Sequence, residues 1–304
     1  MPEPQAYLNG TFVPAAQAVL LPSDGGFVQG VTVAEQLRTF GGKLFRLEAH
    51  LERLFHSLAI VEVDPEPSAE ELATAANELV ARNHPLLSQG DDLGLAMFVT
   101  PGAYAPMTAR GLARPTVCLH TFPLRFDLWA DKFRRGQALA TTDVEQVSTR
   151  CWPPELKCRS RMHYYLADRQ AAARFPGSRA LMLDEDGFIT EATSANLVIY
   201  KEKQGLLVPA AEKILPGISM AVLIELADDL GIACAESDLT PLDLVEASEA
   251  FLTSTSVCML PVTRFNGQPI GGGAVGKTYE RLLAAWNELV GLDVAAQAER
   301  FATR

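Results

Sequence analysis

The stretch that decides the fold is Gly187-Phe188-Ile189-Thr190-Glu191-Ala192-Thr193-Ser194-Ala195-Asn196-Leu197. It follows the turn sequence Asp184-Glu185-Asp186-Gly187, which apolar residues flank at 180–183 and 188–190. Apolar runs around a turn that contains Gly predict a β-hairpin. Residues 197–200 and 206–208 predict a second pair of strands directly after it. This part of the chain is therefore rich in consecutive strands.

Outward from these hairpins, strands and helices mix in both halves of the chain without a regular alternation. Helices are predicted at 164–173 and 219–230, the second closed by Gly231, a residue type favoured after a helix end. In the first half, Asn9-Gly10 predicts a hairpin turn, and Ser68 with Glu71 forms a capping box that opens a helix. An apolar stripe predicts another helix from Leu47, and strands are predicted at 31–40, 43–45, 94–99 and 116–121.

The mixture predicts an α/β (mixed α+β) protein with two domains, a number that also suits a chain of 304 residues. Residues 122–127 have no clear period and precede a change in the pattern of elements. We therefore expect an N-terminal α+β domain at 1–122, a linker at 123–130 and a C-terminal domain at 131–304 that includes Lys157.

Composition restricts the partners. The 26 basic and 37 acidic residues give a formal charge of −11, which disfavours nucleic acid. No apolar run reaches the roughly 20 residues that span a bilayer, and the first residues lack a signal-peptide pattern. Five scattered cysteines without Cys-x-x-Cys spacing favour reduced thiols in the cytoplasm, and the five histidines show no metal-ligand spacing. We expect no metal, membrane or nucleic-acid partner.

One motif points to a different class of protein. Gly271-Gly272-Gly273-Ala274-Val275-Gly276-Lys277-Thr278 matches the nucleotide-binding P-loop pattern in full. A P-loop follows a buried strand, whereas the residues before Gly271 form a turn that contains Pro269. Only 26 residues follow Thr278, too few for the αβ core that would supply a magnesium carboxylate. The motif is therefore interpreted as a glycine-rich loop that leads into a C-terminal helix.

Five segments occur in a fixed order from about Tyr7 to Leu289, and together they resemble the class IV aminotransferases, the fold-type-IV pyridoxal-phosphate enzymes. The resemblance implies a two-domain D-amino acid aminotransferase-like fold, with the cofactor in the interdomain cleft, and a homodimer. The first segment is Asp24 to Gly30, then Glu35 to Leu47, and His50-Leu51-Glu52-Arg53-Leu54. The others are Glu155-Leu156-Lys157-Cys158, the stretch from Gly187 to Leu197, Leu215-Pro216-Gly217-Ile218-Ser219, and Thr253-Ser254-Thr255-Ser256 followed by Leu260-Pro261-Val262.

The resemblance also implies roles for single residues. Lys157 would bond covalently to the cofactor aldehyde and later move the substrate proton. Glu191 would hold the proton on the pyridine nitrogen. The guanidinium of Arg53 would bind the cofactor phosphate. Two turns would bind it as well, one at Ile218 and Ser219 and the other at Thr255 and Ser256. Asn196 is interpreted as structural.

The chain departs from the family pattern at three places. Ala34 replaces the aromatic residue of the substrate pocket, and Met162 replaces a Tyr that bonds the cofactor ring oxygen, a role for which Tyr164 or Tyr165 could substitute. Pro101-Gly102 replaces an Arg that holds the substrate carboxylate. Arg159 and Arg161 could supply this charge and could also lower the pKa of Lys157, Arg159 only if the segment is extended. The alternative for both is an ion pair at a surface or dimer interface.

The reaction we expect is transfer of an amino group between an amino acid, branched-chain or otherwise apolar, and a 2-oxo acid. Two alternatives lie within the family: a D-amino acid aminotransferase and a lyase that acts on aminodeoxychorismate. A third is a non-catalytic descendant of the fold, which retention of Lys157 together with Glu191 argues against.

Overall fold

The computed structural model describes residues 3–108 and 114–303. The chain forms two compact units. Unit 1 comprises Met1–Leu124 together with Leu156–Ser160, and unit 2 comprises Arg125–Glu155 together with Arg161–Arg304. In the described part of the chain, no helix has the length and apolar character needed to cross a bilayer.

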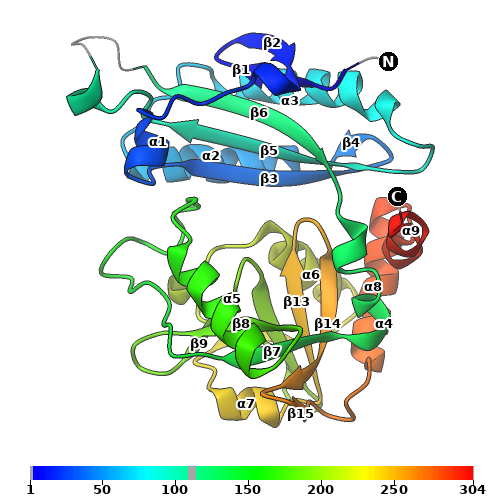
Figure 1. The fold of residues 1–304 in the computed structure, drawn as a ribbon. Helices are drawn as coiled ribbons and strands as arrows, with labels where there is room; N and C mark the ends of the chain where they lie inside the picture. The colour runs from blue at the N-terminus through cyan, green and yellow to red at the C-terminus, as the bar shows by residue number, and fades with distance from the viewer. Residues whose placement is uncertain (1–2, 109–113, 304) are drawn as a thin grey trace. The chain divides into compact units, whose positions relative to one another are not determined.

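Unit 1 contains an antiparallel sheet with the strand order β2-β1-β6-β5-β3-β4. Its strands are β1 (Gln5–Leu8), β2 (Thr11–Pro14), β3 (Val33–Phe40), β4 (Lys43–Leu44), β5 (Leu93–Thr100) and β6 (Thr116–Pro123). Two long helices, α2 (Leu47–Ile60) and α3 (Ala69–Asn83), cover one face of this sheet (Figure 1). The short helix α1 (Gly25–Val28) and the 3-10 turns Ala15–Gln17, His84–Leu86 and Ala105–Met107 lie in the connections.

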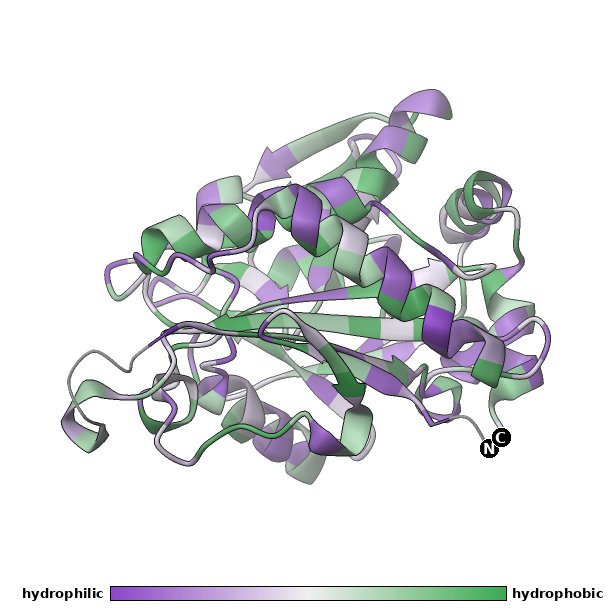
Figure 2. Ribbon diagram, turned by 90° about the horizontal axis from the view of Figure 1, so that it is seen from above, coloured by the Kyte–Doolittle hydropathy of each residue, from purple (hydrophilic) through white to green (hydrophobic). Residues whose placement is uncertain are grey.

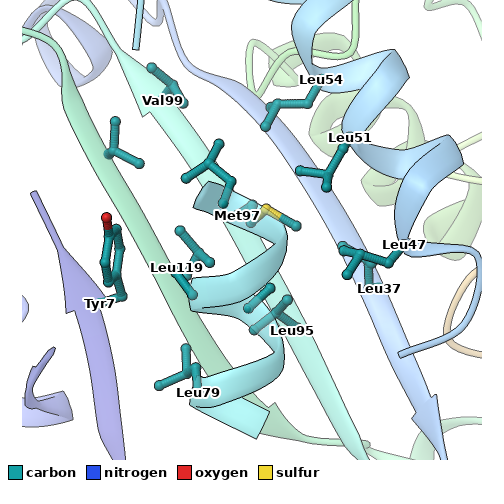
Figure 3. Close-up of a cluster of buried hydrophobic side chains, with 14 of the residues drawn as sticks. Tyr7, Leu37, Leu47, Leu51, Leu54, Leu79, Leu95, Met97, Val99 and Leu119 are labelled. Carbon is teal, nitrogen blue, oxygen red and sulfur yellow. The ribbon is translucent and has the colours of Figure 1, made fainter. Parts of the chain in front are cut away.

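Local sequence explains these elements. Asn9 and Gly10 have φ values of 47° and 88°, as a type I′ hairpin turn between β1 and β2 requires. The capping box of Ser68 and Glu71 is formed at the start of α3. The apolar stripe of α2 packs onto the sheet, so that side chains from α2, α3 and four strands meet in one core (Figure 3). Buried members of this core include Tyr7, Leu37, Leu51, Leu54, Leu79, Leu95, Met97 and Leu119.

Unit 2 is built on a mixed sheet with the order β12-β11-β10-β13-β14-β7-β8-β9, and β15 pairs with β14. The strands are β7 (Gln137–Thr141), β8 (Ser178–Leu183), β9 (Ile189–Ala192), β10 (Asn196–Lys201), β11 (Gly205–Pro209), β12 (Cys234–Ser237), β13 (Glu249–Ser254), β14 (Cys258–Phe265) and β15 (Gln268–Pro269). The helices are α4 (Lys132–Arg135), α5 (Met162–Arg174), α6 (Ile218–Asp229), α7 (Pro241–Val245), α8 (Lys277–Val290) and α9 (Val294–Phe301), with 3-10 turns at Phe126–Leu128 and Ala211–Lys213.

The sheet of unit 2 curls back on itself, because β9 also lies beside β10. Apolar side chains of β7, β8, β9, β10, β11, β13 and β14 fill the space that it encloses. Helix α5 packs on β7 and β8, whereas α6 and α8 pack on β13 (Figure 1). The helices that can be seen in Figure 2 carry both purple and green residues, as expected for helices with one buried and one exposed face.

The predicted elements are present within a few residues of their predicted bounds, and Gly231 closes α6 with a φ of 67°. The division into units differs from the predicted one at Lys157, which was expected in the C-terminal domain. Residues 156–160 group with unit 1 because they pair with β3: the Ala34 amide donates to the Lys157 carbonyl, and the Arg159 amide donates to that of Thr32. The change of unit after Leu124 falls in the predicted linker at 123–130.

Candidate functional site

The backbone of Lys157 is fixed from two sides within unit 1. Its carbonyl oxygen accepts from Ala34 on β3 at 3.0 Å, and its amide donates to the buried Ser57 hydroxyl on α2 at 3.1 Å. Cys158 forms an isolated antiparallel bridge with Val33. The Lys157 side chain is half-buried. A lysine whose backbone is held by both a strand and a helix is presented in a defined direction, as a reacting amine must be.

The same bridge brings two further candidate residues beside Lys157. Antiparallel register places Ala34 opposite Lys157 and Thr32 opposite Arg159. The bridge shows that the backbone is extended at Cys158, the arrangement under which Arg159 would share a face with Lys157. Arg159 is exposed, and its positive charge helps to lower the pKa of His120, after the larger effect of burial.

Arg53, the predicted phosphate ligand, belongs to a buried charged cluster in unit 1. Its Nε and Nη2 donate to the two carboxylate oxygens of Glu35 at 2.7 and 2.8 Å. His50 Nδ1 lies 2.7 Å from Glu35 Oε2. Glu35 comes from β3, while His50 and Arg53 lie one turn apart on α2. All three residues are at most 8% exposed, so the geometry is rigid and the charges are shielded from water.

The electrostatics of this cluster follow from the geometry. Burial alone would raise the pKa of Glu35, but hydrogen bonds from Arg53 and His50 and the charges of Arg53 and Lys157 outweigh it and hold that pKa at about 2. Burial lowers the pKa of His50, even though Glu35 opposes this. At neutral pH, His50 is therefore an uncharged donor and Glu35 a carboxylate. The Lys157 ammonium contributes to both shifts, so it belongs to the same electrostatic environment.

Glu191 is the centre of a second buried cluster, in unit 2. It lies on β9 and is 6% exposed. The hydroxyl of Tyr164, from α5, donates to Glu191 Oε1 through a short hydrogen bond, and Gln146 Nε2 donates to the same oxygen at 3.0 Å. Burial, followed by the charge of Glu191, raises the pKa of Tyr164, which therefore stays a neutral donor. Two neutral donors thus hold the Glu191 carboxylate in place.

The aromatic residues near Met162 have distinct places. Tyr164 points to Glu191, as described above, whereas Tyr165 is exposed and its hydroxyl accepts from Arg169 at 3.4 Å. Met162 is 70% exposed. Arg161 is the half-buried residue directly before α5, and its charge contributes to the lowered pKa of His163, after burial.

The two turns expected to bind phosphate are both in unit 2. Ile218 and Ser219 open the twelve-residue helix α6, and Ser219 is buried. The first amides of a helix are unpaired within it and carry a positive partial charge. Thr255 and Ser256 are half-buried in the turn that joins β13 to β14. The structure thus places Ala34, Arg53, Lys157 and Arg159 in unit 1, and Arg161, Glu191, Ile218, Ser219, Thr255 and Ser256 in unit 2.

Several residues of these clusters had no role assigned from the sequence. Glu35 carried one usable signal, a carboxylate within the apolar run of a predicted strand, which requires a buried cation. His50 carried another, since its spacing of three from Arg53 places both residues on one helix face. Gln146 carried none, because it lies in an irregular segment 45 residues from Glu191.

The rejected P-loop match is explained by the contacts of the helix that follows it. The amides of Thr278 and Tyr279, at the start of α8, donate to the Glu249 carboxylate at 2.9 and 2.8 Å. A Cβ on Gly276 would come within 2.1 Å of the Glu249 side chain. The strand before the loop, β15, has only two residues. A carboxylate of the chain itself therefore takes the place that a nucleotide phosphate would need.

We expect Lys277→Ala to leave amino-transfer activity and stability close to the wild-type values, because Lys277 is exposed at the start of α8. Glu249→Ala should instead lower the free energy of unfolding by about 1 to 2 kcal/mol, since it removes both acceptors of the α8 amides. Urea unfolding and an activity assay measure the two effects. Magnesium-dependent nucleotide binding that is lost in Lys277→Ala would contradict the assignment.

Comparison with known proteins connects the two clusters to one family. The family model for amino-transferase class IV matches residues 32–265, a range that includes Glu35, Arg53, Lys157 and Glu191. The D-alanine aminotransferase of Bacillus licheniformis is 30% identical over 269 residues, which are 88% of this chain and 90% of that protein.

Solved structures give the same result for the fold. The branched-chain amino acid aminotransferase of Escherichia coli superimposes with a TM-score of 0.87 at 23% identity, covering 95% of both chains. That of Thermoproteus uzoniensis, solved with norvaline, gives a TM-score of 0.82 at 25% identity and covers 98% of this chain and 96% of its own. Both sheets and the buried Glu35 and Glu191 clusters thus occur on a fold-type-IV architecture, and the chain belongs to the class IV aminotransferases.

Proposed function

We propose that this aminotransferase uses pyridoxal 5′-phosphate bound through Lys157. The donor set suits this cofactor in three respects. The cofactor aldehyde needs an amine, which Lys157 provides from a backbone held at both its amide and its carbonyl. Its phosphate needs cationic and amide donors, which Arg53 and the start of α6 supply. Its pyridine nitrogen needs a buried acceptor, and Glu191 has two neutral donors that leave its negative charge in place.

Bound pyridoxal phosphate supplies an aldehyde that exchanges amino groups and a ring that accepts the electrons of the broken Cα–H bond. The chain supplies the rest. The Lys157 amine removes the proton from the substrate α-carbon and returns a proton during the second half of the reaction. Glu191 would keep the pyridine nitrogen protonated, and Arg53 and the turns at Ser219 and Thr255 would be the residues that hold the phosphate. The bidentate contact with Glu35 fixes the plane of the Arg53 guanidinium.

The observation that carries this proposal is the pairing of Ala34 with Lys157 across the bridge. The substrate carbon must lie beside the Lys157 amine, so Ala34 lines the same space. Its side chain is small, as an apolar substrate side chain beside Lys157 would require. We propose branched-chain and other apolar amino acids, with their 2-oxo acids, as substrates. Arg159, whose amide bonds Thr32 two residues along the bridge from the Ala34–Lys157 bond, is the proposed carboxylate-binding cation, and Arg161 is the second candidate.

A second candidate is amino transfer from D-amino acids. It is supported by the 30% identity to the D-alanine aminotransferase of Bacillus licheniformis. The two candidates differ in the stereochemistry of the donor and share the same cofactor and the same roles of Lys157 and Glu191. We further propose a homodimer in the cytoplasm, where the five free cysteines would stay reduced.

The experiment that tests the proposal is spectroscopy of the purified protein with single amino donors. The wild-type protein should show visible cofactor absorbance, which an amino donor alone converts to the aminated cofactor. L-leucine, L-valine, D-alanine and D-glutamate compared in this way separate the two candidates. Release of pyruvate from aminodeoxychorismate without any acceptor would instead indicate the lyase reaction.

We expect Glu191→Gln to lower kcat by about 10²-fold or more, because a neutral amide cannot hold the pyridine proton. The free energy of unfolding should change less, since Gln keeps the size of the side chain and can still accept from Tyr164. The measurement is single-turnover kinetics beside urea unfolding. Equal loss of activity and stability would show that Glu191 has only a structural role.

A further inference from the structure

We propose that Asn196 is a positioning residue that builds the phosphate-binding turn at the start of α6. The inference rests on the proposed function, because it concerns how the cofactor phosphate is held. Asn196 is not expected to touch the cofactor. It acts through the turn at 215–219 and through the neighbouring strand β13.

The first observation is the hydrogen bond that ties β10 to this turn. Asn196, the first residue of β10, is 5% exposed. Its Nδ2 donates to the carbonyl oxygen of Leu215 at 2.9 Å. Leu215 lies three residues before α6 begins at Ile218, so this bond fixes the chain just ahead of the helix start. The direction of the first α6 amides therefore depends on Asn196.

The second observation explains why Gly217 stands between Leu215 and α6. Gly217 has φ −73° and ψ 126°, a conformation that any residue can adopt. A Cβ at this position would nevertheless lie 1.9 Å from Asn196 Oδ1. The glycine is thus required by the close approach of the Asn196 side chain and not by its backbone angles. Asn196 and Gly217 form a matched pair.

The third observation connects Asn196 to the second turn. Thr253 on β13 is the cross-strand partner of Asn196, so the two side chains lie on the same face of the sheet. Two residues later the chain reaches Thr255 and Ser256, and the pair of Ser254 with Cys258 closes that turn. Thr253 is 1% exposed, and its hydroxyl has no hydrogen-bond partner among the described residues. Buried hydroxyls are normally hydrogen-bonded, so one without a partner on the strand that leads into Thr255 points to a polar ligand at this end of β13.

These observations give Asn196 a role beyond packing. It holds one turn by a hydrogen bond, and its cross-strand partner lies on the strand that carries the other turn. Phosphate binding by amides depends on their fixed directions, because several donors must point at one group. Loss of Asn196 should therefore weaken the binding of the phosphate and leave the binding of the pyridine ring unchanged.

The test compares two ligands on the cofactor-free full-length protein: pyridoxal phosphate and pyridoxal, which lacks the phosphate. Asn196→Ala should weaken the binding of pyridoxal phosphate by about tenfold, the effect of one lost hydrogen bond at the upper end of its usual contribution. Binding of pyridoxal should stay near its wild-type value. Equilibrium titration followed by absorbance measures both ligands, and needs no substrate turnover.

A double-mutant cycle tests the matched pair. Gly217→Ala alone should weaken pyridoxal phosphate binding at least as much as Asn196→Ala, since the new methyl group displaces the Asn196 side chain. In the Asn196→Ala background the same substitution should have little further effect, because the obstructing side chain is gone. Additive losses in the double variant would overturn the pairing of these two residues.

Asn83→Ala is the matched control. Asn83 is also a buried asparagine that bonds backbone, at Gln5, but it lies in unit 1 on α3. Asn83→Ala should lower the free energy of unfolding without changing the ratio of the affinities for pyridoxal phosphate and pyridoxal. An equal loss for both ligands in Asn196→Ala, or an unchanged ratio, overturns the inference while the proposed function stands. Failure of the wild-type protein to bind pyridoxal phosphate overturns both.

Discussion

Lys157→Ala should abolish the visible cofactor absorbance and reduce amino transfer by more than about 10⁴-fold. Loss of a positioned proton-transfer group alone reduces a rate by about 10²- to 10⁴-fold. The loss expected here is larger, because the same amine also bonds the cofactor. The Lys157 amide bonds Ser57 and its carbonyl bonds Ala34, so the backbone contacts do not depend on the side chain. Folding should therefore be nearly unaffected, which separates chemistry from stability.

The readouts for Lys157→Ala are an absorbance spectrum, single-turnover kinetics and thermal unfolding of the same preparation. Lys43→Ala is a suitable control, since Lys43 is an exposed lysine of the same unit, on β4. It should retain both the spectrum and the activity. Wild-type activity in Lys157→Ala would show that another amine does the chemistry, and would refute the assignment of this lysine.

The sequence predicted the local elements of this fold well, because each depends on residues close together in the chain. The hairpin at Asn9-Gly10 needs two residues with positive φ, and the start of α3 needs only Ser68 and Glu71. The order of sheet strands was not predictable in the same way. In unit 2, β7 pairs with β14 across more than a hundred residues, and no local pattern encodes that register.

The candidate site shows the same limit. Lys157 and Glu191 were predicted from motifs that resemble a family, and the structure adds the residues around them. Lys157 was expected with the C-terminal domain, whereas residues 156–160 group with unit 1, because the pairing of Lys157 with Ala34 joins segments more than a hundred residues apart. The contact of Tyr164 with Glu191 was also missed, since Tyr164 was considered only as a substitute for the ring-oxygen tyrosine. Long-range contacts of single polar side chains carry little signal in one sequence.

Glu35→Gln should be the most destabilising of the conservative substitutions considered for this chain. It leaves the buried Arg53 guanidinium without its carboxylate, and breaking one side of a buried ion pair costs about 3 to 5 kcal/mol. The pKa of Glu35 gives a similar figure, since the difference between its ordinary value of 4.5 and about 2 in the folded protein corresponds to about 3 kcal/mol. Urea unfolding of the cofactor-free protein measures this loss, and hydrogen exchange at residues 33–60 locates it in unit 1.

The pH dependence of this variant provides a second, independent measurement. A carboxyl whose pKa is depressed in the folded protein stabilises it fully above pH 4.5, and this contribution is lost as the pH falls towards 2. The part of the stability difference between wild type and Glu35→Gln that the carboxylate charge provides should therefore be complete above pH 4.5 and shrink between pH 4.5 and 2. Glu35 also raises the pKa of His50 against the larger effect of burial, so protonation of His50 below pH 6.5 should cost the variant more stability than the wild type.

A matched control for Glu35→Gln is available on the surface of the same unit. Glu78 bonds Arg82 on α3, where the two side chains are 47% and 40% exposed. Glu78→Gln should change the free energy of unfolding by less than about 1 kcal/mol, because water and salt screen an exposed pair. Two results would show that the Glu35 carboxylate is not charged in the folded protein. One is an equal loss of unfolding free energy in Glu35→Gln and Glu78→Gln. The other is a stability difference between wild type and Glu35→Gln that does not narrow between pH 4.5 and 2. In that case Arg53 is held in place by contacts other than the pair with Glu35.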